Sequence, residues 1–272
     1  MINFKNKTSG NISKILLKEY PSLTYAELKV LFRKKDIKVD GKRINSDIKL
    51  IGGEDIIVYN KEKKLNIIYE DDNICIVHKP MGVESTNVDR TYTQPSLEEM
   101  SGYYACHRLD MNTEGLIILA KSKAIQAEMH NEFRLGNVHK FYTAKIKGTP
   151  KNSEATLKDY LVKKDDRVYV YKDKVNNSQE IVTKYVVIDK NEDLSIVEVE
   201  LLTGKTHQIR AHFAFIGHPV VGDNKYGDKD FNKRYNVKKQ CLCSTKLTFS
   251  CVSDNLKYLN DLCIQTTPSF KI

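Results

Sequence analysis

The run GLIILA, residues 115–120, constrains the fold most, because it is apolar throughout and is bounded by a glycine and a lysine. It is rich in large aliphatic residues and too short for a stable helix, so it predicts a buried strand. Further runs of this kind, VYVY, IVTKYVVI and LSIVEVELL, alternate with polar turns later in the chain. We therefore expect everything after the first quarter of the sequence to be mostly β.

Two segments of this region have helical features instead. SKAIQAEMHNEFRLG runs from a typical N-cap residue, Ser122, to a C-cap glycine, Gly136, which predicts a helix between them. THQIRAHFAF, residues 206–215, has helical spacing and is stopped by Gly217 and the His218-Pro219 pair. Together with strands predicted in LNIIYEDDNICIVHKP and KFYTAKIKG, these helices indicate an α+β fold.

The first quarter of the chain carries most of its charge. Through residue 64 there are 15 Lys and Arg against 8 Asp and Glu, a net of +7 out of +9 for all 272 residues. A basic segment of this kind can be a solvated helix face, or it can bind the phosphate backbone of a nucleic acid. The residues expected to make such contacts are Arg33, Lys34, Lys35, Lys38, Lys42 and Arg43.

The local pattern of this quarter favours the nucleic-acid interpretation. Helices are predicted at ISKILLKEY and TYAELKVLFRK, the second with an apolar stripe of Leu28, Leu31 and Phe32, and IKVDGKRI predicts a hairpin turning at Asp40-Gly41. This helix-helix-hairpin module, with the closing segment GGEDIIVY, resembles the alpha-L RNA-binding module of a ribosomal small-subunit protein. We place it at residues 1–60, followed by a charged hinge, NKEKK, and a second domain at residues 61–272.

Several other classes of protein find no support in the sequence. No apolar run is long enough to span a bilayer, and the N-terminal segment has neither the apolar region nor the cleavage site of a signal peptide, so a cytoplasmic protein without a membrane partner is expected. The six cysteines lack C-x-x-C spacing and are interpreted as small buried residues, and the spacing of His207, His212 and His218 does not suit a metal site. The GKT at residues 204–206 lacks the earlier glycine that a phosphate-binding P-loop requires, so no nucleotide cofactor is predicted. No metal is predicted either.

Three longer motifs point to one family. HRLDMNTEGLIILAK, KFYTAKIKG and TGKTHQIRAHFAFIGHPVVGDNKYG, in this order, resemble the signature segments of the RluA-type pseudouridine synthases. With YEDDNICIVHKPMG at the entry, the resemblance covers about residues 65 to 250. It implies a mixed, largely antiparallel sheet with flanking helices, and an enzyme that isomerises chosen uridines of RNA to pseudouridine.

The resemblance also implies roles for individual residues. Asp110 of HRLD would be the catalytic carboxylate, acting as a nucleophile or by assisting proton loss from the sugar, and Arg210 would keep it ionised. Tyr142 would stack on the target base and take part in removing a proton from the rejoined ring. The other expected substrate contacts are His107, Arg108, Lys205 and Ile209, of which Ile209 would line the pocket wall.

Two residues depart from the usual family pattern: Glu114 stands where serine is more frequent, and Lys205 where arginine is. Glu114 is expected to add negative charge beside a site that receives RNA, and Lys205 to weaken a backbone contact. The expected substrate is large-subunit ribosomal RNA, with transfer RNA second, and the expected state is a monomer. The alternatives are a catalytically silent RNA-binding or ribosome-assembly factor, which would lack the Asp-Arg pair, and a methyltransferase, which would need a glycine-rich cofactor loop.

Overall fold

The computed structural model describes residues 2–20, 23, 25–59, 65–86 and 95–271. The chain divides into two compact units, one made of residues 1–65 and 86–102 and the other of residues 66–85 and 103–272. We call them the first unit and the second unit. Residues 86–102, assigned by sequence to the second domain, group with the first unit, and the hinge NKEKK lies outside the described residues.

The first unit packs two helices against small sheets. The helices are α1 (Ile12–Glu19) and α2 (Tyr25–Lys34), and α3 (Leu97–Ser101) also belongs to this unit. The main sheet has the order β1 (Ile2–Lys5), β6 (Asp55–Val58), β3 (Ile37–Val39) and β4 (Lys42–Ile44), and β2 (Gly10–Asn11) pairs with β5 (Lys49–Leu50). Strand β1, which no sequence pattern predicted, gives β6 a second neighbour.

The predicted local features of the first unit are present. Leu28, Leu31 and Phe32 of α2 are buried in its core. The hairpin β3–β4 turns at Asp40 and Gly41, which have φ angles of 46° and 77°. A two-residue hairpin turn of this kind needs positive φ at both positions, which Asp-Gly supplies at low cost.

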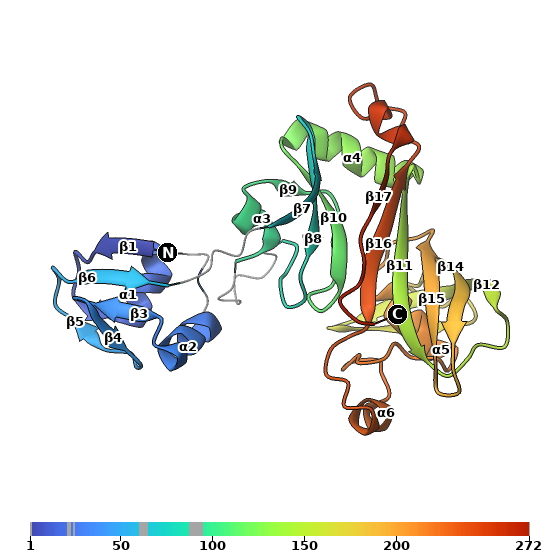
Figure 1. Cartoon of the computed structure of the whole chain (residues 1–272). Coiled ribbons are helices and arrows are strands. Elements are labelled where there is room, and N and C mark those ends of the chain that lie inside the picture. The colour runs from blue at the N-terminus through green and yellow to red at the C-terminus, as the bar shows by residue number, and fades with distance from the viewer. Residues whose placement is uncertain (1, 21–22, 24, 60–64, 87–94, 272) are drawn as a thin grey trace. The chain divides into compact units, whose positions relative to one another are not determined.

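The second unit is built on one large sheet, whose central strands are labelled in Figure 1. Its 11 strands have the order β13-β12-β14-β15-β11-β16-β10-β8-β7, with β17 paired to β16 and β9 to β10. Only the β10–β16 pair is parallel among the described strands, which confirms the predicted mixed, largely antiparallel α+β fold. The strands are β7 (Asn66–Glu70), β8 (Ile74–Lys79), β9 (Tyr104–Ala105), β10 (Glu114–Ala120), β11 (Val138–Lys147), β12 (Glu154–Lys164), β13 (Arg167–Tyr171), β14 (Gln179–Lys190), β15 (Leu194–Leu201), β16 (Leu242–Phe249) and β17 (Cys263–Gln265).

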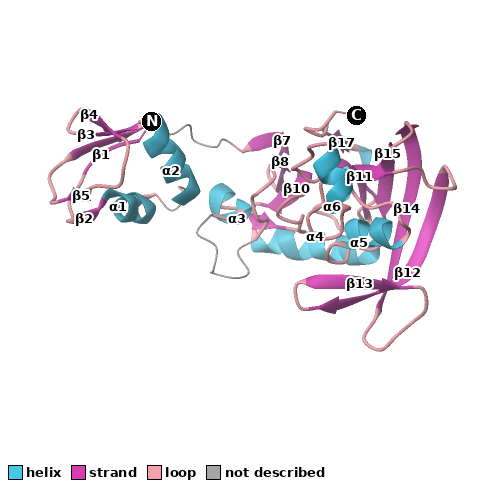
Figure 2. Cartoon of the chain, turned by 90° about the horizontal axis from the view of Figure 1, so that it is seen from below, coloured by secondary structure: helices cyan, strands magenta, loops and turns pink. Residues whose placement is uncertain are grey.

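Helices of the second unit lie around this sheet (Figure 2), and they are α4 (Lys123–Leu135), α5 (Gln208–Phe215), α6 (Lys229–Arg234) and the 3-10 helix η1 (Lys257–Asp261). The predicted caps of α4 are confirmed, because Ser122 accepts a hydrogen bond from Ile125 and Gly136 is left-handed. Helix α4 packs on β9 and β10, whereas α5 packs on β13 and β14. The apolar run that predicted a buried strand is β10, and each of its seven residues is buried.

Three strands meet at one point of the sheet and bring distant motifs together. Gly115 of β10 and Tyr142 of β11 are both paired with Ser244 of β16. Gly115 has a φ of 111°, and a Cβ on it would lie 2.2 Å from the carbonyl oxygen of Ser244. Because only glycine allows this approach, the loop that carries Asp110 enters the sheet one strand away from Tyr142, with Ser244 between them.

Two expectations from composition can be compared with the fold. Five of the six cysteines are buried as predicted, but Cys263 is exposed because it begins the short strand β17. None of the described helices is long and apolar enough to cross a membrane.

Candidate active site

The loop that carries Asp110 is clamped by a buried lysine. Lys79, at the end of β8, has no exposed surface, and its Nζ donates hydrogen bonds to the carbonyls of Val83 at 2.8 Å and Met111 at 3.2 Å. Burial lowers the pKa of Lys79 to about 8, although the charges of Asp110 and Glu114 oppose the shift. Because each of its partners is a backbone carbonyl, the lysine fixes the backbone next to Asp110.

Arg210 joins Asp110 to a second carboxylate. Its Nη1 donates to Asp110 Oδ2 at 2.8 Å, while its Nε and Nη2 hold Asp223 at 2.6 and 3.0 Å. Asp223 is 1% exposed, and the Asp110 side chain is 25% exposed. Burial alone would raise the pKa of Asp223, but the hydrogen bonds and charge of Arg210 outweigh it and lower the pKa. The same two carboxylates raise the pKa of Arg210 against its burial, so the guanidinium is a permanent cation.

Helix α5 is anchored so that Arg210 is presented at a fixed place. His212, two residues further along this helix, has Nδ1 2.9 Å from Thr183 Oγ1 and Nε2 2.9 Å from Asp159 Oδ2, and all three residues are buried. Gln208 donates to Val182 and Thr183 and accepts from the backbone of Lys205. These contacts tie the first turns of α5 to β12 and β14, so Arg210 cannot move without breaking buried hydrogen bonds.

Tyr142 lies in the wall of the same site. It is 5% exposed, and its pKa is raised by burial and by the nearby negative charge of Asp110. The phenol therefore keeps its proton at neutral pH. The structure thus brings together the three residues predicted to be catalytic, Asp110, Tyr142 and Arg210, from a loop, a strand and a helix.

Comparison with known proteins identifies the family of the chain. The sequence profile described as RNA pseudouridylate synthase matches residues 55–215, more than half of the chain. The chain belongs to the RNA pseudouridylate synthase family. A relative from Vibrio parahaemolyticus named ribosomal large subunit pseudouridine synthase C is 30% identical, over 74% of this chain and 71% of the relative. An uncharacterized RNA pseudouridine synthase of Aquifex aeolicus is 29% identical, over 80% of this chain and 77% of the relative.

Solved structures agree on the fold. Human RNA pseudouridylate synthase domain containing 4 superposes with a TM-score of 0.61 at 23% identity, covering 76% of this chain and 90% of the human one. The domain containing 1 protein gives a TM-score of 0.60 at 23% identity, over 78% of this chain and 93% of that one. This chain is therefore an RNA pseudouridine synthase that isomerises uridine in RNA.

Sequence reasoning missed three residues of this pseudouridine synthase. Asp223 holds Arg210, His207 has Nε2 4.0 Å from Asp110 Oδ2, and Tyr226 lies with its hydroxyl 2.9 Å from His207 Nδ1 and its ring beneath the Arg210 guanidinium. All three belong to the third signature segment, so their position in that motif was the available signal. All three lie in loops, and periodicity does not report loop contacts.

The predicted substrate contacts of the synthase fall into two groups. Arg108 and Lys205 are exposed, and Lys205 lines a small hollow of about 270 Å³ with Lys163, Asn177 and Gln179. His107 and Ile209 are turned inward instead. His107 Nε2 accepts a hydrogen bond from the Ile118 backbone, its Nδ1 is buried without a partner among the described residues, and burial lowers its pKa to about 3. Ile209 is buried, in keeping with a role in the pocket wall.

Glu114 carries the expected negative charge, but its carboxylate is buried. It is 4% exposed, and its Oε1 accepts hydrogen bonds from the backbone and hydroxyl of Ser269 at 2.7 and 2.9 Å. His78 Nε2 lies 3.9 Å from its other oxygen. Burial favours protonation, but these contacts outweigh it and lower the pKa of Glu114. The carboxylate therefore fastens the C-terminal segment to the sheet, and it is enclosed by protein rather than presented to RNA.

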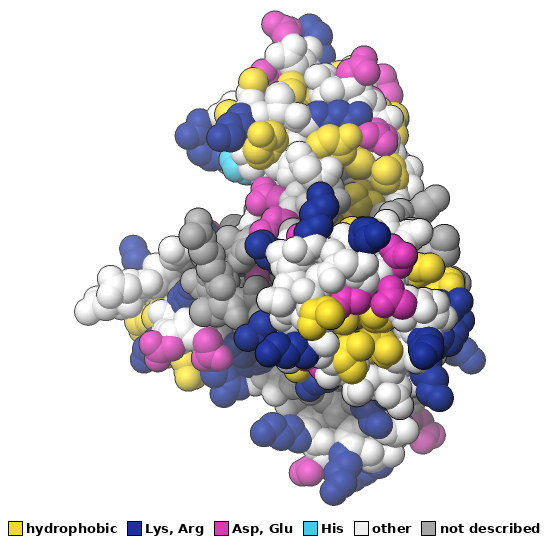
Figure 3. All heavy atoms as spheres, turned by 90° about the vertical axis from the view of Figure 1, so that its left-hand side faces the viewer, with side chains coloured by type: hydrophobic (Ala, Val, Ile, Leu, Met, Phe, Trp, Pro, Cys, Tyr) yellow, Lys and Arg dark blue, Asp and Glu magenta, His cyan; other side chains and the backbone are white. Residues whose placement is uncertain are grey.

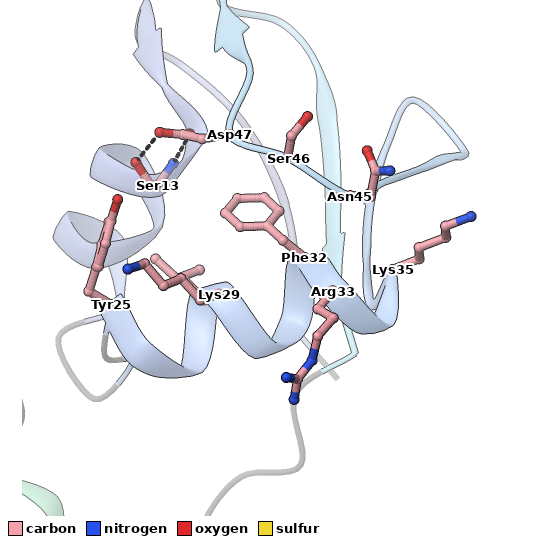
Figure 4. Close-up of a pocket in the computed structure, with 10 residues that line it drawn as sticks. Ser13, Tyr25, Lys29, Phe32, Arg33, Lys35, Asn45, Ser46 and Asp47 are labelled. Carbon is pink, nitrogen blue, oxygen red and sulfur yellow. Dashed lines mark hydrogen bonds between the residues drawn. The ribbon is translucent and has the colours of Figure 1, made fainter.

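Three basic residues of the first unit, Lys29, Arg33 and Lys35, border an open groove. This groove has a volume of about 520 Å³, with α2 as one wall and residues 45–47 as the other. Figure 4 shows Phe32 projecting from α2 toward Ser46, with Tyr25 and Lys29 nearer the N-terminal end of the helix. Of the predicted RNA contacts, Arg33 and Lys35 line the groove, whereas Lys34, Lys38, Lys42 and Arg43 lie outside it. Lys and Arg side chains are spread widely over the face seen in Figure 3.

The groove combines cations with a partly apolar lining. Lys29, Arg33 and Lys35 make no ion pair with the described residues, and Leu28 and Phe32 supply apolar surface. The one acid among the described lining residues, Asp47, accepts hydrogen bonds from the backbone and hydroxyl of Ser13, which lower its pKa although burial opposes them. Within the described ranges of the whole chain, no cluster of three or more His, Cys, Asp and Glu could hold a metal ion.

Proposed function

We propose that this pseudouridine synthase acts on large-subunit ribosomal RNA, with Asp110 as its catalytic carboxylate. The observation that carries the catalytic part is the bridge of Arg210, whose Nη1 is 2.8 Å from Asp110 while its other nitrogens hold the buried Asp223. The ribosomal part is supported by relatives named ribosomal large subunit pseudouridine synthase C, such as the Vibrio parahaemolyticus protein.

The chemistry explains why an ionised carboxylate is needed. Uracil must leave its nitrogen-carbon glycosidic bond, turn, and rejoin the sugar through C5, with the C5 hydrogen lost and a hydrogen gained at N1. Asp110 can promote the first bond change by attacking the sugar carbon or by accepting a proton from the sugar, and both routes require the carboxylate form. Arg210 supplies the counter-charge that keeps Asp110 ionised when a bound nucleotide excludes water.

The remaining residues have supporting roles in this proposal. Tyr142 offers an uncharged phenol beside Asp110, against which the extruded base stacks. Arg108 and Lys205, both exposed, contact the phosphates that flank the target nucleotide. The groove of the first unit, with Lys29, Arg33 and Lys35, holds a more distant stretch of the same RNA.

Mapping pseudouridines in the host's RNA with and without this gene tests the proposal. We expect a small set of large-subunit sites to lose pseudouridine, and to regain it with the wild-type gene but not with Asp110→Asn, which removes the charge and keeps the size. Loss confined to transfer RNA would refute the ribosomal substrate. Restoration by Asp110→Asn would refute the catalytic aspartate.

A further inference from the structure

His207 has an unusual backbone conformation at the edge of the active site. It precedes α5 with φ 53° and ψ 20°, in the left-handed region that non-glycine residues seldom occupy. The contacts of Gln208 with Thr203, Lys205 and Thr183 hold the chain on both sides of it. Conformations of this kind persist where the surroundings over-determine them, and they cluster at functional sites.

The hydrogen bonds of Tyr226 indicate which nitrogen of His207 carries the proton. The hydroxyl oxygen of Tyr226 accepts the backbone N–H of Val168 at 2.9 Å and lies 2.9 Å from His207 Nδ1. Burial raises the pKa of Tyr226, so its hydroxyl keeps its own proton and can donate it to Nδ1. A neutral imidazole that accepts at Nδ1 has its hydrogen on Nε2. That nitrogen is the one 4.0 Å from Asp110 Oδ2.

Asp110 is approached on one oxygen only. Arg210 Nη1 donates to Oδ2, and His207 Nε2 faces the same atom. No described residue donates a hydrogen bond to Oδ1. A carboxylate held in this way has one oxygen fixed by the protein and the other open to a substrate.

We propose that His207 is a positioning residue that, held by Tyr226, closes on Asp110 Oδ2 when a uridine enters and so directs Oδ1 at the nucleotide. The inference rests on the proposed role of Asp110. His207 makes no bond to substrate, and its contribution is a hydrogen bond to Asp110 Oδ2 that forms, from a separation of 4.0 Å, as the site fills. Hydrogen bonds of catalytic groups are often long before substrate binds.

The charges around His207 favour its neutral form. Burial lowers its pKa, and the positive charges of Arg210 and Lys225 act in the same direction, while Asp110 and Asp223 oppose them. These groups come from α5, from the loop before β10 and from the loop after Val221. Protonation below this pKa would turn the ring into a second cation on Oδ2 and make Asp110 less basic, so turnover should fall on the acid side.

Two substitutions in the full-length enzyme separate the hydrogen bond from the backbone. His207→Ala and His207→Gln bear a similar left-handed strain, but only Gln places a donor near the position of Nε2. Turnover is measured as the release of tritium from RNA labelled at uridine C5. We expect His207→Ala to lower kcat about tenfold or more and to keep KM for a short RNA within about twofold of the wild-type value. We expect His207→Gln to recover most of the loss and to abolish the acid-side fall in kcat.

Tyr226→Phe tests the hydrogen bond that holds His207, because it removes the hydroxyl and keeps the ring beneath Arg210. It should lower kcat less than His207→Ala does, and His139→Gln, which changes a half-buried histidine on β11 outside the site, should leave kcat unchanged. The inference is overturned if His207→Ala keeps kcat within twofold of wild type, or if Gln is as impaired as Ala at an unchanged melting temperature. Activity retained by Asp110→Asn would instead refute the proposed function.

Discussion

At the scale of single residues, Asp223 holds Arg210 in the position from which it donates a hydrogen bond to Asp110. It is 1% exposed, and removing it leaves a buried guanidinium with one partner instead of two. We expect Asp223→Ala to lower the free energy of unfolding by about 3–5 kcal/mol and to reduce turnover. Asp166→Ala removes an exposed carboxylate paired with Lys225 and should leave the urea midpoint unchanged. Equal midpoints for the two variants would contradict the structural role of Asp223.

His107 makes stability depend on pH. Its pKa in the folded protein is about 3 because of burial, below the ordinary 6.5, so the unfolded chain binds more protons between these values. The stabilisation is complete above pH 6.5 and is lost as the pH falls toward 3. When the pH is lowered from 6.5 to 5, His107 alone should lower the free energy of unfolding by roughly 1.5 kcal/mol.

His107→Gln removes this titration and retains an acceptor for the Ile118 N–H. We therefore expect urea denaturation at pH 5 and pH 7 to show a smaller difference in the variant than in the wild type. An equal pH dependence in both proteins would assign the effect to other groups, of which the buried His212 is the first candidate.

At the scale of elements, the close approach of β10 to β16 depends on Gly115. A Cβ there would lie 2.2 Å from the Ser244 carbonyl oxygen and 2.5 Å from its nitrogen, and neither backbone atom can move without disturbing β11. We expect Gly115→Ala to destabilise the protein by about 3 kcal/mol or more and to inactivate it by displacing the Asp110 loop.

Gly136 supplies the matched control for this prediction. It also has positive φ, but a Cβ on it would meet nothing within 4 Å. Gly136→Ala should therefore show only the left-handed strain of about 1–2 kcal/mol and should keep its turnover. Thermal melting and tritium release decide the comparison, and similar losses in both variants would mean that the approach to Ser244 is unimportant.

At the scale of the whole molecule, the first 64 residues carry +7 of the net charge of +9, so RNA affinity and chemistry should be separable. Lys29→Ala with Arg33→Ala removes two cations from the groove, whereas Lys5→Ala with Lys18→Ala makes the same charge change elsewhere in the first unit. We expect the groove pair alone to flatten the plot of log affinity against log salt, by about one unit for each phosphate that the protein no longer neutralises. Equal slopes for the two pairs would mean that net charge, not the groove, attracts RNA.

Much of the local structure was determined by the sequence itself. The β10 run, the Asp40-Gly41 turn and the caps of α4 depend on residues within a few positions of one another, so their patterns suffice. The motifs also indicated Asp110, Tyr142 and Arg210, because the residues of a signature segment keep their order along the chain whatever their partners are.

The tertiary structure alone decided how these residues are held. Arg210 meets Asp110 across 100 positions, and Glu114 meets Ser269 across 155, so neither pairing leaves a periodic trace in the sequence. The left-handed backbone conformation of His207 leaves no periodic trace either, because contacts of Gln208 and Tyr226 hold it in place. A buried polar group takes the partner that the packed sheet brings to it, and that choice exists only once the strands have found their register.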